Sequence, residues 1–377
     1  MQASGSAYQL SRLQLRGYVR TTLPWTQIDQ TLTASDWSSV PSVAAYGFRL
    51  SPRLGVALGI WIPSHEAISL VSTVRSAGPL TTGGEVVQVE YSQQIAISQT
   101  IERTYFGAAA GFALREGLRV GASAFLVYER FQEFLDLFVG ALTSSPQNGA
   151  TASASIRGTP TQFAARLGLG LQWDVAPIWS VALAAKTPAL ALVTVGGLTT
   201  VVESVSVLPG ATPSVAFAQS TSPVSRIAEP WRVAVGSAVA VGDSSVRAEV
   251  DWQAPQGGRH GVVNGRAGLH HTATPDLAWG VGFFTDLSRE DVHSGSLTVD
   301  YYGVAGGVDW RPTPVRAARG PGATWDMRTS LALRYAYGFG EVERLQANVF
   351  GPASATSTAP TNVHALSVNL GGIVEFR

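Results

Sequence analysis

The sequence predicts an all-β protein, a transmembrane antiparallel β-barrel of about fourteen strands. Three observations favour this fold: many segments alternate apolar and polar residues, the connections alternate between tight turns and long loops, and charged residues are scarce. Backbone N–H and C=O groups find no water in hydrocarbon, so a sheet crosses a membrane only when it closes on itself. Closure gives each strand one face toward lipid and one toward the lumen, which explains the alternation.

The alternation is clear in segment 54–63, where Leu58 and Ile60 share one face and Gly59 lies on the other. Segment 118–130 repeats it with charged residues on the second face. The predicted strands are 12–22, 41–50, 54–63, 100–114, 118–130, 161–173, 178–187, 229–241, 246–253, 262–271, 277–285, 298–310, 326–337 and 362–376.

Connections of two kinds join these strands. The tight turns are built from Gly, Pro, Asp and Ser, which favour turn geometry; they are 51–53, 115–117, 174–177, 242–245 and 272–276. The long loops include 64–99, 131–160 and 188–228. Short turns face the periplasm and long loops the outside, so both termini are expected on the periplasmic side. Residues 85–97 also alternate, a pattern that would extend the neighbouring strands above the membrane.

Composition agrees with a barrel. Only 14% of the 377 residues are charged, against roughly 25% in soluble domains. The net charge is zero, which gives no reason to expect a nucleic-acid partner. No cysteine is present, so disulfides and thiolate metal sites are excluded. Residues 1–10 lack the apolar core of a signal peptide, and we expect that a leader has been removed or lies upstream.

The sequence carries no catalytic motif. A G-x-S-x-G segment is absent, and His65-Glu66 lacks the second histidine of a zinc-protease helix. His270 and His271 are neighbours on a predicted strand, so their side chains point to opposite faces and cannot share a metal. We therefore expect no enzyme activity, no metal and no cofactor.

The inward faces of the predicted strands carry mostly basic charges. The candidates for lumen charge are Arg119, Arg166, Lys186 and Arg232. A basic lumen can attract a carboxylate, which arginine binds through two hydrogen bonds. The alternative is that these charges pair across neighbouring strands, as Asp251 could with Arg266, and only keep the lumen polar. Aromatic residues at strand ends, among them Trp61 and Trp231, are interpreted as interfacial girdles.

Residues 131–142 are predicted to form a short helix in an extracellular loop. Apolar residues recur at helical spacings of three, four and seven, namely at Phe131, Phe134, Leu135, Phe138 and Leu142. We predict that these five residues, together with Leu190 and Leu192 of the next large loop, line a hydrophobic ligand-binding groove. The alternative is that the helix packs against that neighbouring loop and caps the barrel.

Three segments resemble the FadL family of outer-membrane channels for long-chain fatty acids and aromatic hydrocarbons. Residues 106–123, with the turn Arg115-Glu116-Gly117, look like the family's hairpin ahead of its large third loop. Segment 41–63 is similar to its second and third strands, and Glu229-Pro230-Trp231 to its return from the fourth loop. The likeness covers most of the chain.

The resemblance implies an N-terminal hatch that plugs the lumen, but the family's Asn-Pro-Ala segment is absent. We therefore expect residues 1–11 to be a truncated hatch and 12–377 a single barrel. The resemblance also implies a kink at Gly55 and Gly59 that opens a lateral exit through the wall. Close packing against the bare backbone of these glycines is the alternative.

We expect a monomeric protein of the bacterial outer membrane that allows passive uptake of hydrophobic small molecules such as long-chain fatty acids. Its partners would be that ligand, membrane lipid and lipopolysaccharide, with detergent replacing lipid in vitro. Two alternatives stay open: a structural or adhesive barrel with a closed lumen, and a porin for polar solutes.

Overall fold

The computed structural model describes most of the chain. The described residues are 6–41, 43–82, 84–144, 148–207, 212–223, 229–256, 259–289, 297–311, 315–316, 324–343, 345–347 and 358–376. All their regular elements are strands, joined in one sheet of 21 segments. In this part of the chain, a helix with the length and apolar character to span a membrane is not found.

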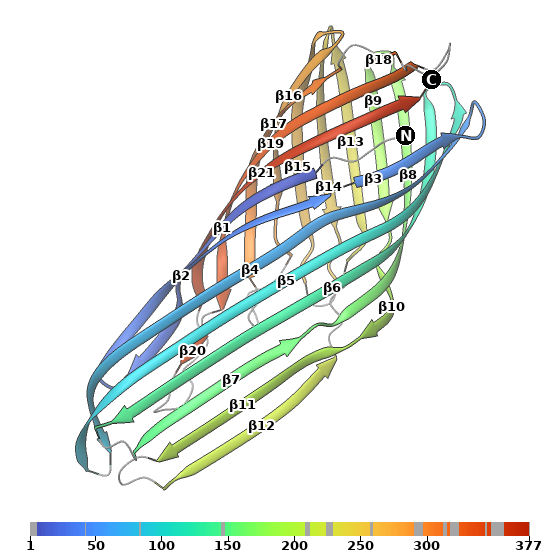
Figure 1. Cartoon of the computed structure of the whole chain (residues 1–377). Coiled ribbons are helices and arrows are strands. Elements are labelled where there is room, and N and C mark those ends of the chain that lie inside the picture. The colour runs from blue at the N-terminus through green and yellow to red at the C-terminus, as the bar shows by residue number, and fades with distance from the viewer. Residues whose placement is uncertain are drawn as a thin grey trace.

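The sheet forms the barrel wall seen in Figure 1. In order of pairing, the wall strands are β4 (Leu54–Thr82), β5 (Glu85–Arg115), β6 (Leu118–Thr143), β8 (Thr161–Ala176), β9 (Trp179–Lys186), β13 (Arg232–Val241), β14 (Ser244–Gln253), β15 (Val262–Thr274), β16 (Leu277–Asp286), β17 (Leu297–Trp310), β19 (Thr324–Glu343), β21 (Thr358–Phe376) and β1 (Ser6–Leu23). β1 pairs with β2 (Thr26–Pro41). After one intervening residue the chain continues as β3 (Val43–Arg49), which pairs with β4. Among the described residues no ladder joins β2 to β4, so the wall returns to its starting strand through the chain from β2 to β3.

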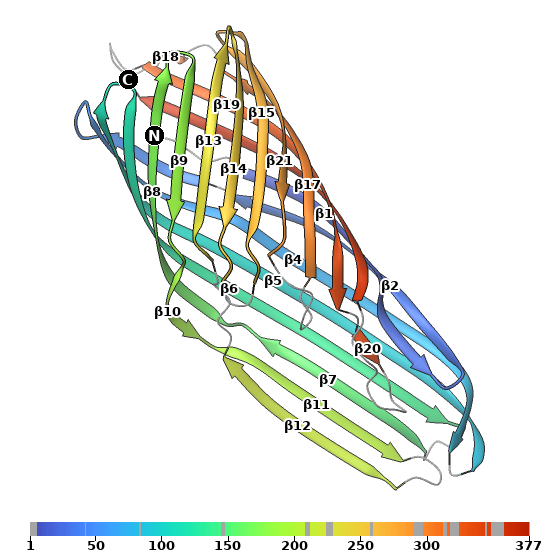
Figure 2. The same ribbon diagram turned by 180° about the vertical axis from the view of Figure 1, so that it is seen from behind.

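Tight turns close the end of the barrel drawn at the top of Figures 1 and 2, at the positions that turn chemistry predicts. Gly117 and Gly242 have φ values of 74° and 57°, a left-handed conformation that glycine adopts without steric cost. Residues 6–11, expected to precede the barrel, belong instead to β1 and pair with both β2 and β21. The expected division after residue 11 is therefore wrong for this segment.

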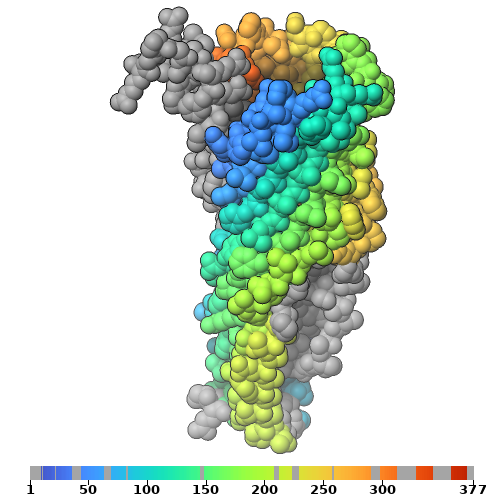
Figure 3. Space-filling model, turned by 90° about the vertical axis from the view of Figure 1, so that its right-hand side faces the viewer, coloured from blue at the N-terminus to red at the C-terminus, as the bar shows by residue number. Residues whose placement is uncertain are grey.

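Three wall strands are far longer than a membrane requires. β4, β5 and β6 have 29, 31 and 26 residues, whereas about 9–11 residues cross a bilayer. Their outer halves pair with one another, and the outer half of β6 pairs with β7 (Gly149–Gly158). β7 pairs with β11 (Gly197–Val207), and β11 pairs with β12 (Ser214–Pro223). We call this sheet the distal extension: residues 69–102 and 130–143 together with β7, β11 and β12. It stands out below the barrel in Figure 1 and in the space-filling view of Figure 3.

The distal extension corrects two predictions. Residues 131–142, predicted as a helix, are the outer part of β6, and most of the predicted loops 64–99 and 188–228 is strand. The sheet as a whole therefore has more segments than the predicted fourteen. The smaller segments among them are β10 (Leu190–Val195), β18 (Val315–Arg316) and β20 (Leu345–Ala347). The alternating segment 85–97 does extend β5 beyond the barrel, as its pattern indicates.

The outer surface of the barrel is apolar. Large apolar side chains on the outward faces are exposed, including Leu58, Phe106, Leu126, Leu167, Leu169, Val235, Val250, Phe283, Val304 and Leu333. A soluble protein rarely exposes an apolar patch of this extent, and this is the band that faces lipid tails in membrane barrels.

Candidate functional site

A cavity of about 770 Å³ occupies the middle of the barrel lumen. Strands β4, β9, β13 to β17 and β19 line it, because their inward faces meet there. The side chains that give it chemical character are Trp61, Lys186, Arg232, Asp251, Phe284 and Arg334. Trp61, predicted at the interfacial girdle, instead faces the lumen and packs on Tyr105, with ring centroids 5.0 Å apart.

Most charges of this cavity pair across neighbouring strands, as the pairing alternative predicted. Arg232 Nε donates to Asp251 Oδ1 at 2.8 Å, and Asp251 is almost fully buried. Arg266 lies 3.6 Å from Glu249, the residue directly opposite it on β14. The suggested pair of Asp251 with Arg266 is therefore wrong, although both residues are paired. Such pairs keep the lumen polar without leaving a buried charge uncompensated.

Two cations of the cavity lie over aromatic rings. Lys186 Nζ is 5.3 Å from the centre of the Trp61 ring, and Arg334 Cζ is 4.0 Å from that of Phe284. Within the described residues, neither has a carboxylate closer than 4 Å. Cation–π contact neutralises a cation less than a carboxylate does. Asp286, a carboxylate of the same lining, also has no described cation within ion-pair distance. The cavity therefore combines apolar surface with two cations and one carboxylate outside the ion pairs, which leaves a net positive charge that can attract an anion.

The lumen toward the tight turns is lined by small residues. Two further hollows, of about 660 and 410 Å³, lie against inward-facing positions such as Gly55, Ala109, Gly121, Gly170, Ala182 and Gly268. Side chains this small leave space between the walls. The described part of the lumen is thus open from the charged cavity toward the turn end.

The opposite side of the cavity is partly filled. A buried apolar cluster, the distal plug, joins the inward faces of β1, β2, β4, β5, β17, β19 and β21. Its members are Leu13, Leu15, Tyr18, Val19, Leu32, Ala34, Leu70, Ile95, Val299, Val342, Ala359 and Val363. These strands follow one another around the wall, and their inward apolar side chains fill part of the interior between the cavity and the distal extension.

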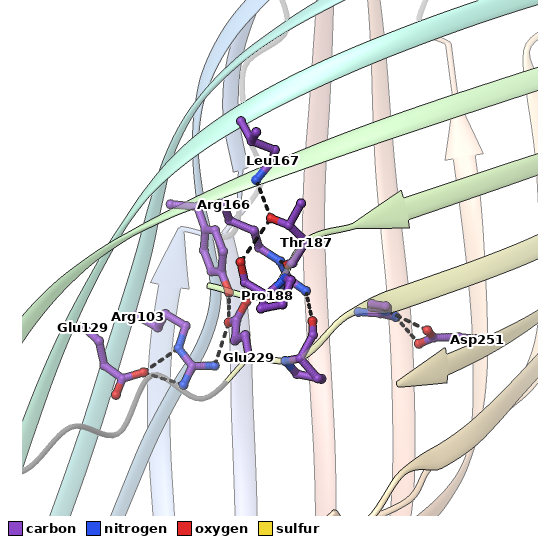
Figure 4. A network of polar contacts seen from close by, with 11 residues as sticks. Arg103, Glu129, Arg166, Leu167, Thr187, Pro188, Glu229 and Asp251 are labelled. Carbon is purple, nitrogen blue, oxygen red and sulfur yellow. Dashed lines mark hydrogen bonds and ion pairs between the residues drawn. The ribbon is translucent and has the colours of Figure 1, made fainter. Parts of the chain in front are cut away.

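An ion-pair network borders the cavity beside β8 and β9 (Figure 4). Arg103 Nε donates to Glu129 Oε2 at 2.7 Å, and Arg103 Nη1 lies 3.2 Å from Glu229 Oε1. Glu229 also binds Arg166 and the Tyr105 hydroxyl. Arg166 Nε donates to the carbonyl oxygen of Thr187 at 2.9 Å. The network joins β5, β6 and β8 to the chain just before β13.

The four predicted lumen cations have different environments. Arg166, Lys186 and Arg232 lie near one another around the cavity and the network. Arg119 lies at the turn end, half exposed, 3.3 Å from Asp174.

Three members of the network, Arg103, Tyr105 and Glu229, were not predicted from the sequence. The inward phase of β5 would have indicated the first two, since Arg103 and Tyr105 alternate with outward Thr104 and Phe106. Glu229 is the first residue of the predicted strand 229–241, but β13 begins only at Arg232, so the alternation of the strand does not place this side chain.

The structure separates the residues of the predicted groove. Phe131 and Leu135 lie on the inward face of β6, and Phe131 is buried, whereas Phe134, Phe138 and Leu142 lie on the outward face. A strand turns alternate side chains to opposite sides, so a helical spacing of apolar residues is split between two faces. Leu190 and Leu192 are exposed on β10, which pairs with β8 and not with this part of β6. The predicted groove is therefore wrong as a single surface.

The predicted kink at Gly55 and Gly59 is also absent, since the β3–β4 ladder runs without a break from Val43↔Trp61 to Arg49↔Gly55. A Cβ atom on Gly59 would lie 2.9 Å from the Ala44 carbonyl oxygen, so close packing explains this glycine. The irregularity of β4 lies instead between Trp61 and Ser64, where Pro63 lacks an N–H for the ladder.

Comparison with known proteins supports this fold. No family model matches the sequence, and no curated protein matches it. Among solved structures, a FadL homologue of Pseudomonas aeruginosa is similar with a TM-score of 0.55 and 10% identity, over 98% of this chain and 90% of that one. The Pseudomonas putida toluene transporter TodX gives a TM-score of 0.55 and 13% identity, over the same shares of the two chains. The chain therefore has the fold of FadL-type outer-membrane β-barrels.

Proposed function

We propose that the protein is a channel of the bacterial outer membrane that takes up hydrophobic small molecules passively. The observation that carries this proposal is the central cavity, where apolar surface and two aromatic rings adjoin Lys186 and Arg334. The apolar outer band supports contact with membrane lipid and, in the outer leaflet, with lipopolysaccharide. The similarity to a toluene transporter supports a hydrophobic cargo.

Long-chain fatty acids are the cargo that best fits the two cations. A carboxylate gains charge-assisted hydrogen bonds from an ammonium or guanidinium group, while an acyl chain gains from burial against aromatic rings. A neutral aromatic hydrocarbon would gain only from burial against the aromatic rings. The two cargo classes are therefore separable by removing one charge.

The test measures uptake of radiolabelled oleate and toluene by Gram-negative cells that lack their own channels for these compounds. Lys186→Met keeps the aliphatic stem over Trp61 but removes the charge. We expect about tenfold slower oleate uptake, because a hydrogen bond to a charged group contributes about 1.5–3 kcal/mol, and unchanged toluene uptake. Arg119→Met is the matched control, since Arg119 lies at the turn end beside Asp174.

Two outcomes would contradict the proposal. If cells with and without the protein take up both compounds equally, it is not a hydrophobic channel. If labelled sugars pass as fast as oleate, the porin alternative is correct. The distal plug argues against that alternative, because apolar side chains fill part of the interior through which polar solutes would pass.

The adhesive alternative is favoured by one observation. The outward face of the distal extension exposes apolar side chains, including Phe138, Leu142 and Phe217, and such patches mark interaction surfaces. If Phe217→Asp abolishes binding of protein-bearing cells to one another while oleate uptake is retained, both roles belong to the same molecule.

A further inference from the structure

The distal extension ends in a strand with an open edge. β12 pairs with β11 along its whole length, from Ser206↔Ser214 to Gly197↔Pro223, and this is its one ladder among the described strands. In Figures 1 and 2, β12 is the outermost strand of the extension, and its second edge is turned away from the barrel. A row of N–H and C=O groups without a strand partner is a template for pairing with another strand.

Both faces of β12 are open as well. Every side chain from Ser214 to Ser222 is exposed, and Val215 and Phe217 are 79% and 63% exposed. These two lie on the outward face, which continues across β11 and β7 to Phe138 of β6. Within the described residues, β12 thus gains neither core packing nor a second ladder. A strand with so little support is stabilised by pairing with a further strand.

The composition of β12 leaves this edge unprotected. Natural edge strands avoid pairing through charged side chains, an internal proline or a bulge. Residues 214–222 contain neither a charged residue nor a proline, and the β11–β12 register runs without a break. The partner that fits this edge is therefore an uncharged strand. The β12 strand of a second copy meets that requirement, because neither strand brings a charge that repels the other.

Pairing of β12 with itself has a defined register. Antiparallel strands of two identical chains are related by a two-fold axis perpendicular to the sheet, which places one residue opposite its own copy. Pro213 and Pro223 bound the strand, and Ala218 lies midway between them. With Ala218 at the axis, all of residues 214–222 find a partner. Moving the axis in either direction would bring a proline into the ladder, and proline has no N–H to donate.

The same axis fixes the direction of the second barrel. The extension continues the barrel wall (Figure 1), so an axis perpendicular to its sheet is also perpendicular to the long axis of the molecule. The second barrel therefore points the opposite way, and the two copies cannot share one membrane. The open edge lies remote from the tight turns, which face the periplasm in outer-membrane barrels. Self-pairing thus places the second copy in a facing membrane, outside the cell.

We propose that β12 pairs with β12 of a second copy on a neighbouring cell, so that the distal extension forms a homophilic contact between cells. The contact goes beyond cargo uptake and rests on the outer-membrane location of the proposed function. A single ladder is smaller than a standard protein interface, so each pair is weak. Many copies on each surface strengthen the contact through multivalency.

The first test uses the absence of native cysteine. Directly opposite residues of an antiparallel pair have Cα atoms about 4.5–5.5 Å apart, within reach of a disulfide. Ala216→Cys and Ser220→Cys are carried by two separate cell populations, since these positions face each other across the axis. We expect a disulfide-linked dimer after mild oxidation of the mixed populations. Either population alone should give none, because identical positions lie about 13 Å apart along the ladder.

The matched control mixes Ser220→Cys cells with Val71→Cys cells. Val71 is also exposed, but it lies on β4, away from β12. This mixture should give no dimer. Heat-dependent mobility on gels checks that each variant folds as a barrel.

A second test places charges at the axis. Ala218→Lys brings two like charges opposite each other, which disfavours the pairing. Cells that carry it should clump about fivefold less than cells with the native chain, measured by flow cytometry of two differently coloured populations. Mixing Ala218→Lys cells with Ala218→Glu cells should restore mixed clumps, because opposite charges then meet. Val71→Lys is the control and should leave clumping unchanged.

The outcomes separate this proposal from the channel function. Absence of the mixed disulfide between folded variants, or an equal yield in the Val71→Cys control, overturns the β12 contact. If Ala218→Cys, which lies opposite its own copy, links equally in cells too dilute to touch, the copies share one membrane and the contact between cells is overturned. Oleate uptake should be unchanged in all these variants. Absence of oleate and toluene uptake by the native chain overturns the channel function and leaves the β12 contact intact.

Discussion

The barrel and the distal extension are built from the same long strands but have opposite polarity. In β5, inward Val89, Tyr91 and Ile95 are buried in the extension, whereas the barrel part turns apolar Phe106 and Phe112 outward. The phase of the strand does not change between Val89 and Tyr105, because odd-numbered residues face inward in both parts. What changes, near residues 103–106, is the face of the strand that carries the apolar side chains. The solvent outside each part, water or lipid, therefore decides which face carries the apolar residues.

The inward face of each part follows from this difference. Three buried clusters pack on the inward face of the extension, the first of them together with β1, β2, β17, β19 and β21. Trp25 at the β1–β2 turn packs over Gly78 of β4. In the barrel, small and charged residues leave the lumen hollow. A filled interior stabilises a sheet in water, whereas a hollow lumen is tolerated where lipid covers the outside.

The largest expected effect comes from placing a charge inside the extension. Ile95 is 1% exposed within the distal plug. Ile95→Asp should lower the free energy of unfolding by about 4 kcal/mol or more, because an unpaired charge is buried. Gln94→Asp, on the outward face of the same strand, is the matched control and should change it by less than about 0.5 kcal/mol. Denaturant titration in detergent measures both; equal effects would show that the interior is not a packed core.

A charge on the outside should distinguish the two parts directly. Leu169 of β8 and Val71 of β4 are each 67% exposed, but the first faces lipid and the second water. Leu169→Arg should cost about 2–4 kcal/mol in a bilayer, as for an arginine near the midplane of a membrane barrel. Val71→Arg should be nearly neutral. Unfolding equilibria in lipid vesicles provide the measurement, and a similar cost at both sites would contradict the reversal of polarity.

A smaller effect is expected where the β1–β2 turn packs on the extension. A Cβ atom on Gly78 would overlap the Trp25 ring, so Gly78→Ala should cost about 2 kcal/mol by overpacking. A Cβ atom on Gly265 of β15 would meet no heavy atom within 4 Å, and Gly265→Ala should change stability little. Protease sensitivity of the β1–β2 turn reports the first change; unchanged resistance in Gly78→Ala would show that Trp25 packs elsewhere.

Alternation predicted the barrel because apolar and polar residues alternate along its short strands with a period of two. The predicted strand 277–285 matches β16 (Leu277–Asp286) closely, and the tight turns followed from their glycines and prolines. The extension was missed at 131–142, where apolar residues recur at helical spacings and lie on both faces of the strand, so that alternation does not mark it. Pairing with β5 and β7 decides between helix and strand, and the local sequence does not contain that partner.

The site was predictable only in part, for a similar reason. The inward phase of their strands identified Arg166, Lys186 and Arg232 as lumen residues. Their partners depend on how distant segments meet: Arg166 and Glu229 are 63 positions apart in the chain.

The most direct measurement places a single fluorescent label at position 169 or 71 through Leu169→Cys or Val71→Cys, in a chain without other cysteines, and compares quenchers dissolved in lipid and in water. We expect the label at 169 to be quenched by the lipid-bound quencher and the label at 71 by the aqueous one. Quenching of both labels by the aqueous quencher alone would show that the barrel does not face lipid.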